Sequence, residues 1–194
     1  QLQYNWTPST YSISGIASYN ISIGTHTGDG TPYTTVPPST YTVLTGLILQ
    51  TGTTYYAKVR AISKSGTLSN WSSASDGIFV DSTPALGFNV YGGTTTAGVS
   101  VPAIDNSGVI SGNWDVTVDS ETGVVEYWYG IWKNVKTGEP NVYPWTVNDP
   151  VLCTSVTLAV ALENNATYYL GIKAKNGAGL YTAVQYSNGV RIES

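Results

Sequence analysis

The chain has 194 residues and a formal net charge of −4, and only 10% of its residues are Asp, Glu, Lys or Arg. An average soluble domain carries roughly 25% charged residues, so the polarity here comes instead from Ser, Thr, Tyr, Asn and Gly. No cluster of Lys or Arg could neutralise a phosphate backbone, so we expect no nucleic-acid partner. No apolar run approaches the roughly 18 residues needed to span a bilayer, so we expect no membrane insertion.

Short segments that alternate apolar and polar residues run through the whole chain, separated by Gly, Pro, Asn and Asp. This pattern predicts an all-β protein, and no stretch has a sustained helical period. In chain order, the predicted strands are residues 2–7, 17–24, 41–47, 54–62, 77–80, 87–91, 109–116, 125–133, 156–161, 167–174 and 189–192.

The chain contains an internal repeat. Thr-Tyr-Tyr followed by alternating residues occurs at residues 54–61 and again at 167–174, and Trp6 and Trp114 recur in the same order. A repeat of about 110 residues has the size of a whole domain rather than of a solenoid unit. We therefore expect two domains, residues 1–82 and 83–194, joined by a short segment in which Pro84 limits flexibility.

Alternation along the predicted strands assigns their side chains to two faces. The side chains expected in the two cores are Tyr19, Ile21, Ile23, Tyr55, Ala57, Val59, Ala61, Tyr127, Tyr129, Ile131, Tyr168, Leu170, Ile172 and Ala174. The same faces are apolar in both halves, which supports two similar sheets.

Both halves resemble fibronectin type III domains, which are immunoglobulin-like β-sandwiches of seven strands. Trp6 and Trp114 match the core Trp of that family's second strand, and Tyr55 and Tyr168 match its tyrosine corner. The Val-Asp-x-Thr-Pro join at residues 80–84 is similar to the joins in long extracellular repeat proteins. The resemblance implies two such sandwiches in tandem and an extracellular or cell-surface location.

The first half begins only five residues before Trp6, so we expect it to lack the family's first strand, strand A. The second half has a candidate for that strand at residues 87–91. Two explanations stay open: the chain is cut from a longer array, or a strand from elsewhere fills the exposed edge. The start at Gln1 and the absence of Met favour a processed product or a segment of a longer protein.

Few residues suggest catalysis. His26 is the only His and lies in the turn at residues 24–30, while the single Cys153 is distant in sequence. A nucleophile needs a base within hydrogen-bond reach, and zinc needs more His or Cys ligands than these. We expect no catalytic residue and no cofactor. Cys153 cannot form an internal disulfide, and a small apolar filler is its favoured role over a nucleophile or an intermolecular link.

Asp115, Asp119 and Glu121 lie close together in sequence. They suit a weak calcium site, a glycosidase pair, or the capping of a turn through backbone N–H groups. The last role is the favoured one, because the resemblance places these residues in the loop between the second and third strands.

Aromatic residues provide the candidate binding surface. Trp128 and Trp132 alternate with Gly130 on the outward side of a predicted strand, with Trp145 and Tyr169 nearby. Such a platform suits sugar rings or a partner protein. Alternatively, the rings cover sheet positions left bare by glycine.

Four Asn-x-Ser/Thr triplets are possible glycosylation sites in a secreted protein, at Asn5, Asn20, Asn70 and Asn165. The favoured function is a non-catalytic structural or adhesive spacer of an extracellular surface or filament protein, which could self-assemble. Its expected partners are neighbouring domains or copies of the same protein. The alternative is a carbohydrate- or protein-binding accessory module of a larger secreted protein.

Overall fold

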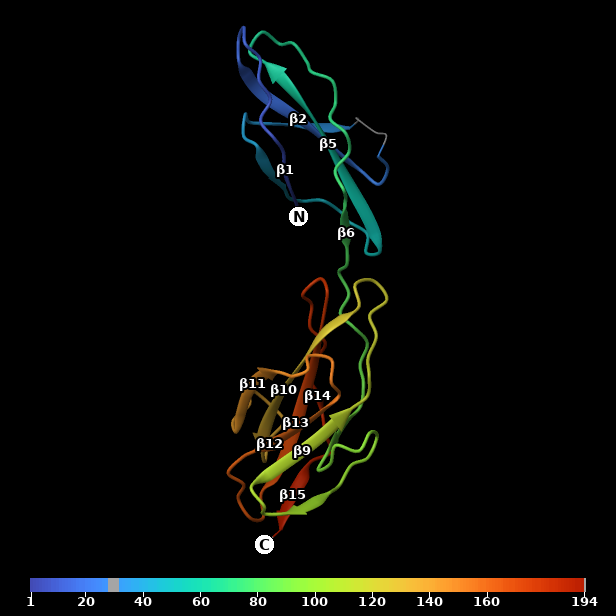
Figure 1. Cartoon of the computed structure of the whole chain (residues 1–194), viewed down its shortest axis with the longest axis vertical. Coiled ribbons are helices and arrows are strands. Elements are labelled where there is room, and N and C mark those ends of the chain that lie inside the picture. Colours follow the sequence, from blue (N-terminus) through green and yellow to red (C-terminus); the bar gives the residue numbers. More distant parts are fainter. Residues whose placement is uncertain (28–31, 194) are drawn as a thin grey trace. The chain divides into compact units, whose positions relative to one another are not determined.

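The computed structural model describes residues 1–27 and 32–193, and every regular element in these ranges is a β-strand (Figure 1). The chain divides into two compact units, Gln1–Asp81 and Ser82–Ser194. Residues 28–30 of the turn that contains His26 lie outside the described residues. Within the described ranges, no helix is long and apolar enough to cross a membrane.

The first unit consists of two antiparallel sheets. One contains β1 (Leu2–Asn5) and β4 (Tyr41–Leu44). The other has the order β3-β2-β5-β6, with β2 and β5 as its long central pair. The strands of this sheet are β2 (Ile16–Gly24), β3 (Tyr33–Val36), β5 (Thr53–Ser63) and β6 (Ile78–Val80).

The second unit has the same plan with more strands. Its smaller sheet has the order β12-β9-β7, and its larger sheet has the order β11-β10-β13-β15-β8, with β14 paired to β13. All pairs are antiparallel except β15 with β8, which is parallel. The strands are β7 (Val90–Gly92), β8 (Ala103–Asp105), β9 (Val109–Trp114), β10 (Val124–Lys133), β11 (Tyr143–Val147), β12 (Ser155–Ala159), β13 (Thr167–Asn176), β14 (Gln185–Tyr186) and β15 (Val190–Glu193).

Each core lies between the two sheets of its unit and contains the side chains that alternation predicts. Tyr168, Leu170, Ile172 and Ala174 of β13 are all buried. Ala57 and Ala61 of β5 are buried as well, with their alternate neighbours packed against the same cluster. The predicted all-β class and tandem sandwich fold are thus confirmed.

In each unit, a tyrosine hydroxyl accepts a hydrogen bond from a backbone N–H of the turn before its strand, at matching positions of the repeat. The Tyr55 hydroxyl accepts the Gln50 N–H at 3.0 Å, and the Tyr168 hydroxyl accepts the Glu163 N–H at 2.9 Å. These are the two expected tyrosine corners. A second pair, Tyr19 and Tyr127, accepts backbone N–H groups in the loop before β2 and the loop before β10.

Side-chain hydroxyls extend the pairing of the last long strand in each unit. The Ala61 N–H of β5 donates to Ser69 Oγ, and the Ala174 N–H of β13 donates to Thr182 Oγ1. Ser187 Oγ accepts the Leu170 N–H in the same way. The chain beyond each strand therefore binds to it through short hydroxyl side chains as well as through backbone groups.

The predicted strand positions agree with the structure to within a few residues, except that the chain turns after Leu44, near Gly46, which has a φ of 70°. The strands not predicted are the short ones, β3, β8, β11 and β14. In the described part of the first unit, β1 pairs with β4 alone, whereas its counterpart β9 pairs with both β12 and β7. Among its described residues, the first unit thus has no strand at the position that β7 occupies in the second.

Removing the Tyr168 hydroxyl with Tyr168→Phe is expected to lower the free energy of unfolding by about 1 kcal/mol, since the buried ring stays and only the bond to Glu163 N–H is lost. Urea unfolding followed by circular dichroism measures this. Tyr169→Phe, on the opposite face of the same strand, is the matched control and should cost much less. Equal costs for the two variants would contradict the corner assignment.

Candidate functional site

The predicted aromatic surface lies on the outer face of the larger sheet of the second unit. The members of this outer aromatic cluster come from β10, β11, β14 and the segment after β13, and are Trp128, Trp132, Trp145, Tyr181 and Tyr186. Strand alternation explains the placement, because the inward neighbours Tyr127, Tyr129 and Ile131 fill the core.

Trp132 is the centre of this cluster and is fully buried, with an exposed fraction of 0%. Its ring makes edge contacts with Trp145 and Tyr186, at centroid distances of 5.2 and 5.1 Å. Its indole N–H donates to the Gly138 carbonyl at 3.2 Å. The ring occupies the space above Gly171, where a Cβ would lie 2.4 Å from Trp132 Cζ3. Trp132 thus covers a strand glycine.

The expectation that Trp132 forms part of an exposed platform is therefore wrong. A side chain that points outward from a sheet does not contact water when other rings and a loop lie over it. Trp132 has no face left for a sugar or a partner protein. Trp128 and Trp145 lie at the rim of the cluster and are half-buried.

Lys173 of β13 occupies the faces of the rim aromatic rings. Its Nζ lies 4.3 Å from the centroid of Trp145, 4.7 Å from Tyr181 and 5.5 Å from Trp128. Such cation–π contacts contribute about 0.5–1 kcal/mol at exposed sites. The Trp128 indole N–H also donates to Glu126 at 2.9 Å, and this bond is the main cause that lowers the pKa of the Glu126 carboxyl. Charged side chains therefore hold the rim rings Trp128 and Trp145 in place, in addition to ring packing.

Tyr169, the fourth predicted surface residue, packs elsewhere. A Cβ on Gly189 would lie 2.6 Å from Tyr169 Cε1, and Lys136 Nζ lies 4.6 Å from the Tyr169 ring centroid. Tyr169 pairs in register with Trp132, but among the described residues the contact given for its ring is with Lys136 and not with a tryptophan.

The first unit has a smaller version of this arrangement. Arg60, which aligns with Lys173 in the repeat, lies with its guanidinium 5.0 Å from the Tyr33 ring centroid and 4.6 Å from Trp71. Asn20 lies beside this contact and is 2% exposed. Its amide nitrogen donates to Thr35, and its amide oxygen accepts from Arg60. A cation held by aromatic rings is thus a structural feature of both units.

The burial of Asn20 corrects one predicted glycosylation site, because a glycan on this amide would have to displace Thr35 and Arg60. The other three candidates are exposed: Asn5, Asn70 and Asn165. Asn165 has a φ of 64° and accepts a bond from Arg191 at 3.3 Å. Glycosylation at these three positions stays a prediction.

The three acidic residues proposed for calcium have separate bonding partners. Asp119 Oδ1 accepts the N–H groups of Glu121, Thr122 and Gly123, as expected for a turn cap, and these bonds, with Thr122 the strongest, lower the pKa of Asp119. Asp115 instead accepts from Asn89 and Tyr91. Glu121 accepts the Ser120 hydroxyl. Calcium binding stays a prediction.

The two single residues considered for catalysis lie in different units. His26 is exposed, and its Nδ1 lies 3.1 Å from Thr25 Oγ1. Cys153 is half-buried, with its Sγ 3.7 Å from Ser155 Oγ.

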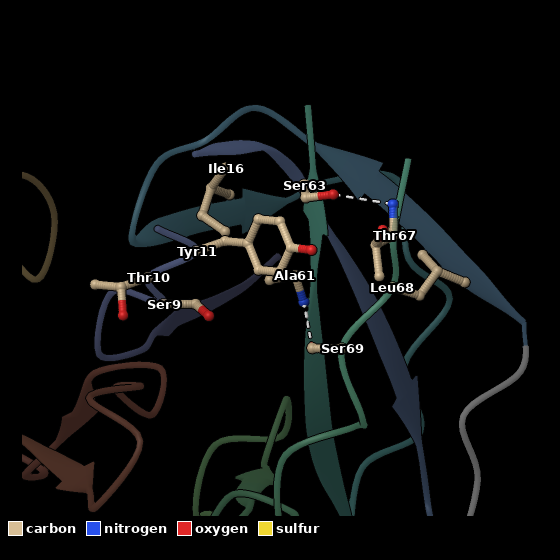
Figure 2. Close-up of a pocket in the computed structure, with 9 residues that line it drawn as sticks. All are labelled: Ser9, Thr10, Tyr11, Ile16, Ala61, Ser63, Thr67, Leu68 and Ser69. Atoms are coloured by element: carbon tan, nitrogen blue, oxygen red, sulfur yellow. Dashed lines mark hydrogen bonds between the residues drawn. The ribbon is translucent and has the colours of Figure 1, made fainter. Parts of the chain in front are cut away.

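A hollow in the first unit was not predicted from the sequence (Figure 2). Its volume is about 120 Å³, and its walls come from the loop after β1, the start of β2, the end of β5 and the segment after β5. In the close-up, the Tyr11 ring lies beside Ala61, with Ile16 above it. The lining is largely apolar, and no residue in it is charged. Only alignment of the two halves, residue by residue, could have pointed to this place.

Comparison with solved structures shows the same fold. The chain is similar to a crystal structure of the FN1–FN3 domains of chicken CNTN1, with a TM-score of 0.53 and 16% sequence identity. The match covers 97% of this chain and 62% of that one, so the chain spans less than two thirds of the matched structure. No protein-family model matches the chain, and no curated protein sequence does. The fold is therefore that of tandem fibronectin type III domains.

Trp132→Ala is expected to lower the free energy of unfolding by about 3–5 kcal/mol, because it removes a buried ring and exposes Gly171. Trp145→Ala removes a half-buried ring from the same cluster and serves as the matched control with a smaller cost. Urea unfolding with circular dichroism compares the two. Near-equal small losses would show that Trp132 is not the centre of the packing.

Asp119→Asn is expected to reduce stability at pH 7 by about 1 kcal/mol, since the amide keeps one acceptor oxygen but loses the charge that faces three N–H groups. The folded pKa of Asp119 is lowered, so its contribution is present above the ordinary carboxyl pKa of about 4 and is lost as the pH falls through the folded value. The difference between wild type and variant should therefore shrink in acid.

Urea unfolding across a pH series measures that difference. Asp76→Asn, on an exposed turn of the first unit, is the control and should leave stability at pH 7 unchanged. A difference that stays constant down to strongly acidic pH would contradict the capping role of Asp119.

Proposed function

We propose that the chain is a non-catalytic structural or adhesive segment of an extracellular surface or filament protein, in which tandem sandwiches act as spacers. The observation that carries this proposal is the repetition of one sandwich design, with the same corners and the same cation–aromatic contacts in both units. A spacer needs compact domains that follow one another along the chain, and the two units with their separate cores support this role.

The residues that suggested chemistry have structural partners. Asp119 caps a turn, Trp132 covers a strand glycine, and Asp115 ties β7 to β9 through Asn89 and Tyr91. The surface carries few charges and many hydroxyl groups, which suits contact with neighbouring domains more than electrostatic capture of a charged ligand. The likeness to consecutive FN1–FN3 domains of CNTN1 supports a serial role.

The alternative, a carbohydrate-binding module, has weaker support. Sugar recognition of this kind uses open ring faces, but Lys173 lies over the rings of Trp128, Trp145 and Tyr181. Trp132, at the centre, is buried. A ligand would have to move the lysine before it could stack.

An antibody raised against the chain tests the location that the proposal requires. We expect it to label intact, unpermeabilised cells of the source organism or the filaments they release. Trypsin treatment of the intact cells should remove most of the signal, and an antibody against an internal protein is the control for membrane integrity. Labelling that appears only after permeabilisation would contradict the extracellular role.

A further inference from the structure

The sequence contains two Asn-Gly dipeptides, at residues 176–177 and 188–189, and their surroundings in the second unit differ. An asparagine before glycine is chemically labile, because glycine has no Cβ to keep its backbone nitrogen away from the preceding side chain. Reaction needs an Asn side chain that is free to turn toward that nitrogen. Exposure and hydrogen bonding therefore decide which of the two dipeptides can react.

The first dipeptide is held in a closed site. Asn176 is 0% exposed, and its Nδ2 donates to the Thr83 carbonyl at 2.9 Å and to Asp119 Oδ2 at 3.1 Å. The Gly177 N–H donates to the Gly123 carbonyl at 3.0 Å. Neither reacting group can move without breaking these bonds, so the fold protects Asn176.

The second dipeptide has both reacting groups free. Asn188 is exposed, and its side chain makes no hydrogen bond with any residue that the structure describes. The Gly189 N–H likewise has no acceptor within residues 1–27 and 32–193. In the first unit the matching N–H, that of Gly77, donates to Ser75 Oγ at 3.3 Å. Nothing in the described chain therefore keeps the Asn188 side chain from its neighbour's nitrogen.

The segment that contains Asn188 joins β14 to β15 and is anchored on β13 at both ends (Figure 1). Before it, Ser187 is fully buried, and its N–H donates to the Leu170 carbonyl at 2.9 Å. After it, Val190 pairs with Tyr168. Residues 188 and 189 alone connect the two anchors, so the length of backbone between them is fixed.

Gly189 is required in this connection. Its φ is 97°, and a Cβ on it would lie 2.6 Å from Tyr169 Cε1 and 2.9 Å from Thr167 Cγ2. Another residue here would be strained in its backbone and would displace the Tyr169 ring. A variant that blocks the reaction must therefore change Asn188 and keep the glycine.

We propose that Asn188 is a site of spontaneous deamidation in the folded chain. The Gly189 nitrogen gives its proton to water and forms a bond to Asn188 Cγ. The Cγ–Nδ2 bond then breaks, and Nδ2 takes up a proton and leaves as ammonia. Water adds to one of the two carbonyl carbons of the resulting five-membered imide and breaks its bond to the Gly189 nitrogen, which regains a proton. One water is consumed, one ammonia is released, and nothing is oxidised or reduced.

The two ring openings give different products. Opening at Cγ restores the ordinary backbone and leaves aspartate. The first unit has Asp76 before Gly77 at the matching place, so an aspartate fits this connection. Opening at the backbone carbonyl leaves isoaspartate, in which the backbone runs through Cβ and Cγ and is one carbon longer. The longer product does not fit between the anchors without displacing Ser187 or Val190.

Incubation of the purified full chain at mildly alkaline pH tests the proposal. Chymotrypsin separates the two dipeptides by cleavage after Tyr181 and Tyr186, and mass spectrometry follows each peptide with time. We expect Asn188 to convert at least about tenfold faster than Asn176, because Asn176 reacts only after its site opens locally. The chain unfolded in guanidinium chloride is the control, and there both asparagines should convert at similar rates. Equal protection of both in the folded chain would overturn the proposal.

Two variants separate the chemistry from its structural effect. Asn188→Gln would have to close a larger ring and should stay unmodified over the same period, and Asn188→Asp carries the direct product. We expect aged wild type to unfold at lower urea concentration as isoaspartate accumulates, whereas aged Asn188→Gln and fresh Asn188→Asp keep their midpoints. An unchanged midpoint in a sample rich in isoaspartate would contradict the fixed length of the connection. None of these outcomes depends on the extracellular spacer role.

Discussion

Each unit depends on one long antiparallel strand pair, β2 with β5 in the first and β10 with β13 in the second. With a single Cys in the chain, no internal disulfide supports either sandwich, so stability must come from the apolar faces of these pairs. The pair also fixes where everything else can lie. The tyrosine corners, the hydroxyl contacts after β5 and β13 and the cation–aromatic contacts are all built on one of these four strands.

Side chains cover the outer faces of both strand pairs. Both units use a cation packed against aromatic rings, and the cover is larger in the second unit. In the second unit Gly171 leaves room above the sheet, and Trp132 fills it. A fully buried indole needs a partner for its N–H, and the Gly138 carbonyl supplies one. In the first unit Arg60 between Tyr33 and Trp71 gives a smaller cover. The larger cluster therefore exists because a glycine in the strand leaves space above the sheet. Its size does not indicate a binding function.

The sequence predicts the parts of the fold that are encoded locally and in duplicate. Alternation over β5 and β13 identifies the inward side chains, and the repeated Tyr55 and Tyr168 identify the corners. Short strands such as β3, β8 and β14 are not predicted, because two to four residues give too few alternations to separate a strand from a loop. Their pairing is decided by long strands that lie elsewhere in the sequence.

The surface of the sheet was harder to predict than its core. Period-2 alternation gives the direction in which Trp132 and Asn20 point, but it carries no information on what lies above them. Trp145 and Tyr186 bury the first, and Thr35 with Arg60 buries the second. Asp119 was the opposite case. A carboxylate two to four residues before the N–H groups of a turn favours a cap through local geometry alone, so the sequence is sufficient there.

At the place of the hollow, the two units differ in the side chain that ties neighbouring segments together. In the second unit Asn176 is fully buried and bonds to Thr83, to Asp119 and to Leu180, so the segment at Thr83 and the capped turn share one polar residue. The first unit has Ser63 and Tyr11 at the positions of Asn176 and Asp119. Ser63 already bonds to Ser65 and Thr67, and Tyr11 offers a ring instead of a carboxylate. The Ser63 side-chain bonds therefore stay within the turn after β5, whereas the buried Asn176 amide links three separate segments of the second unit.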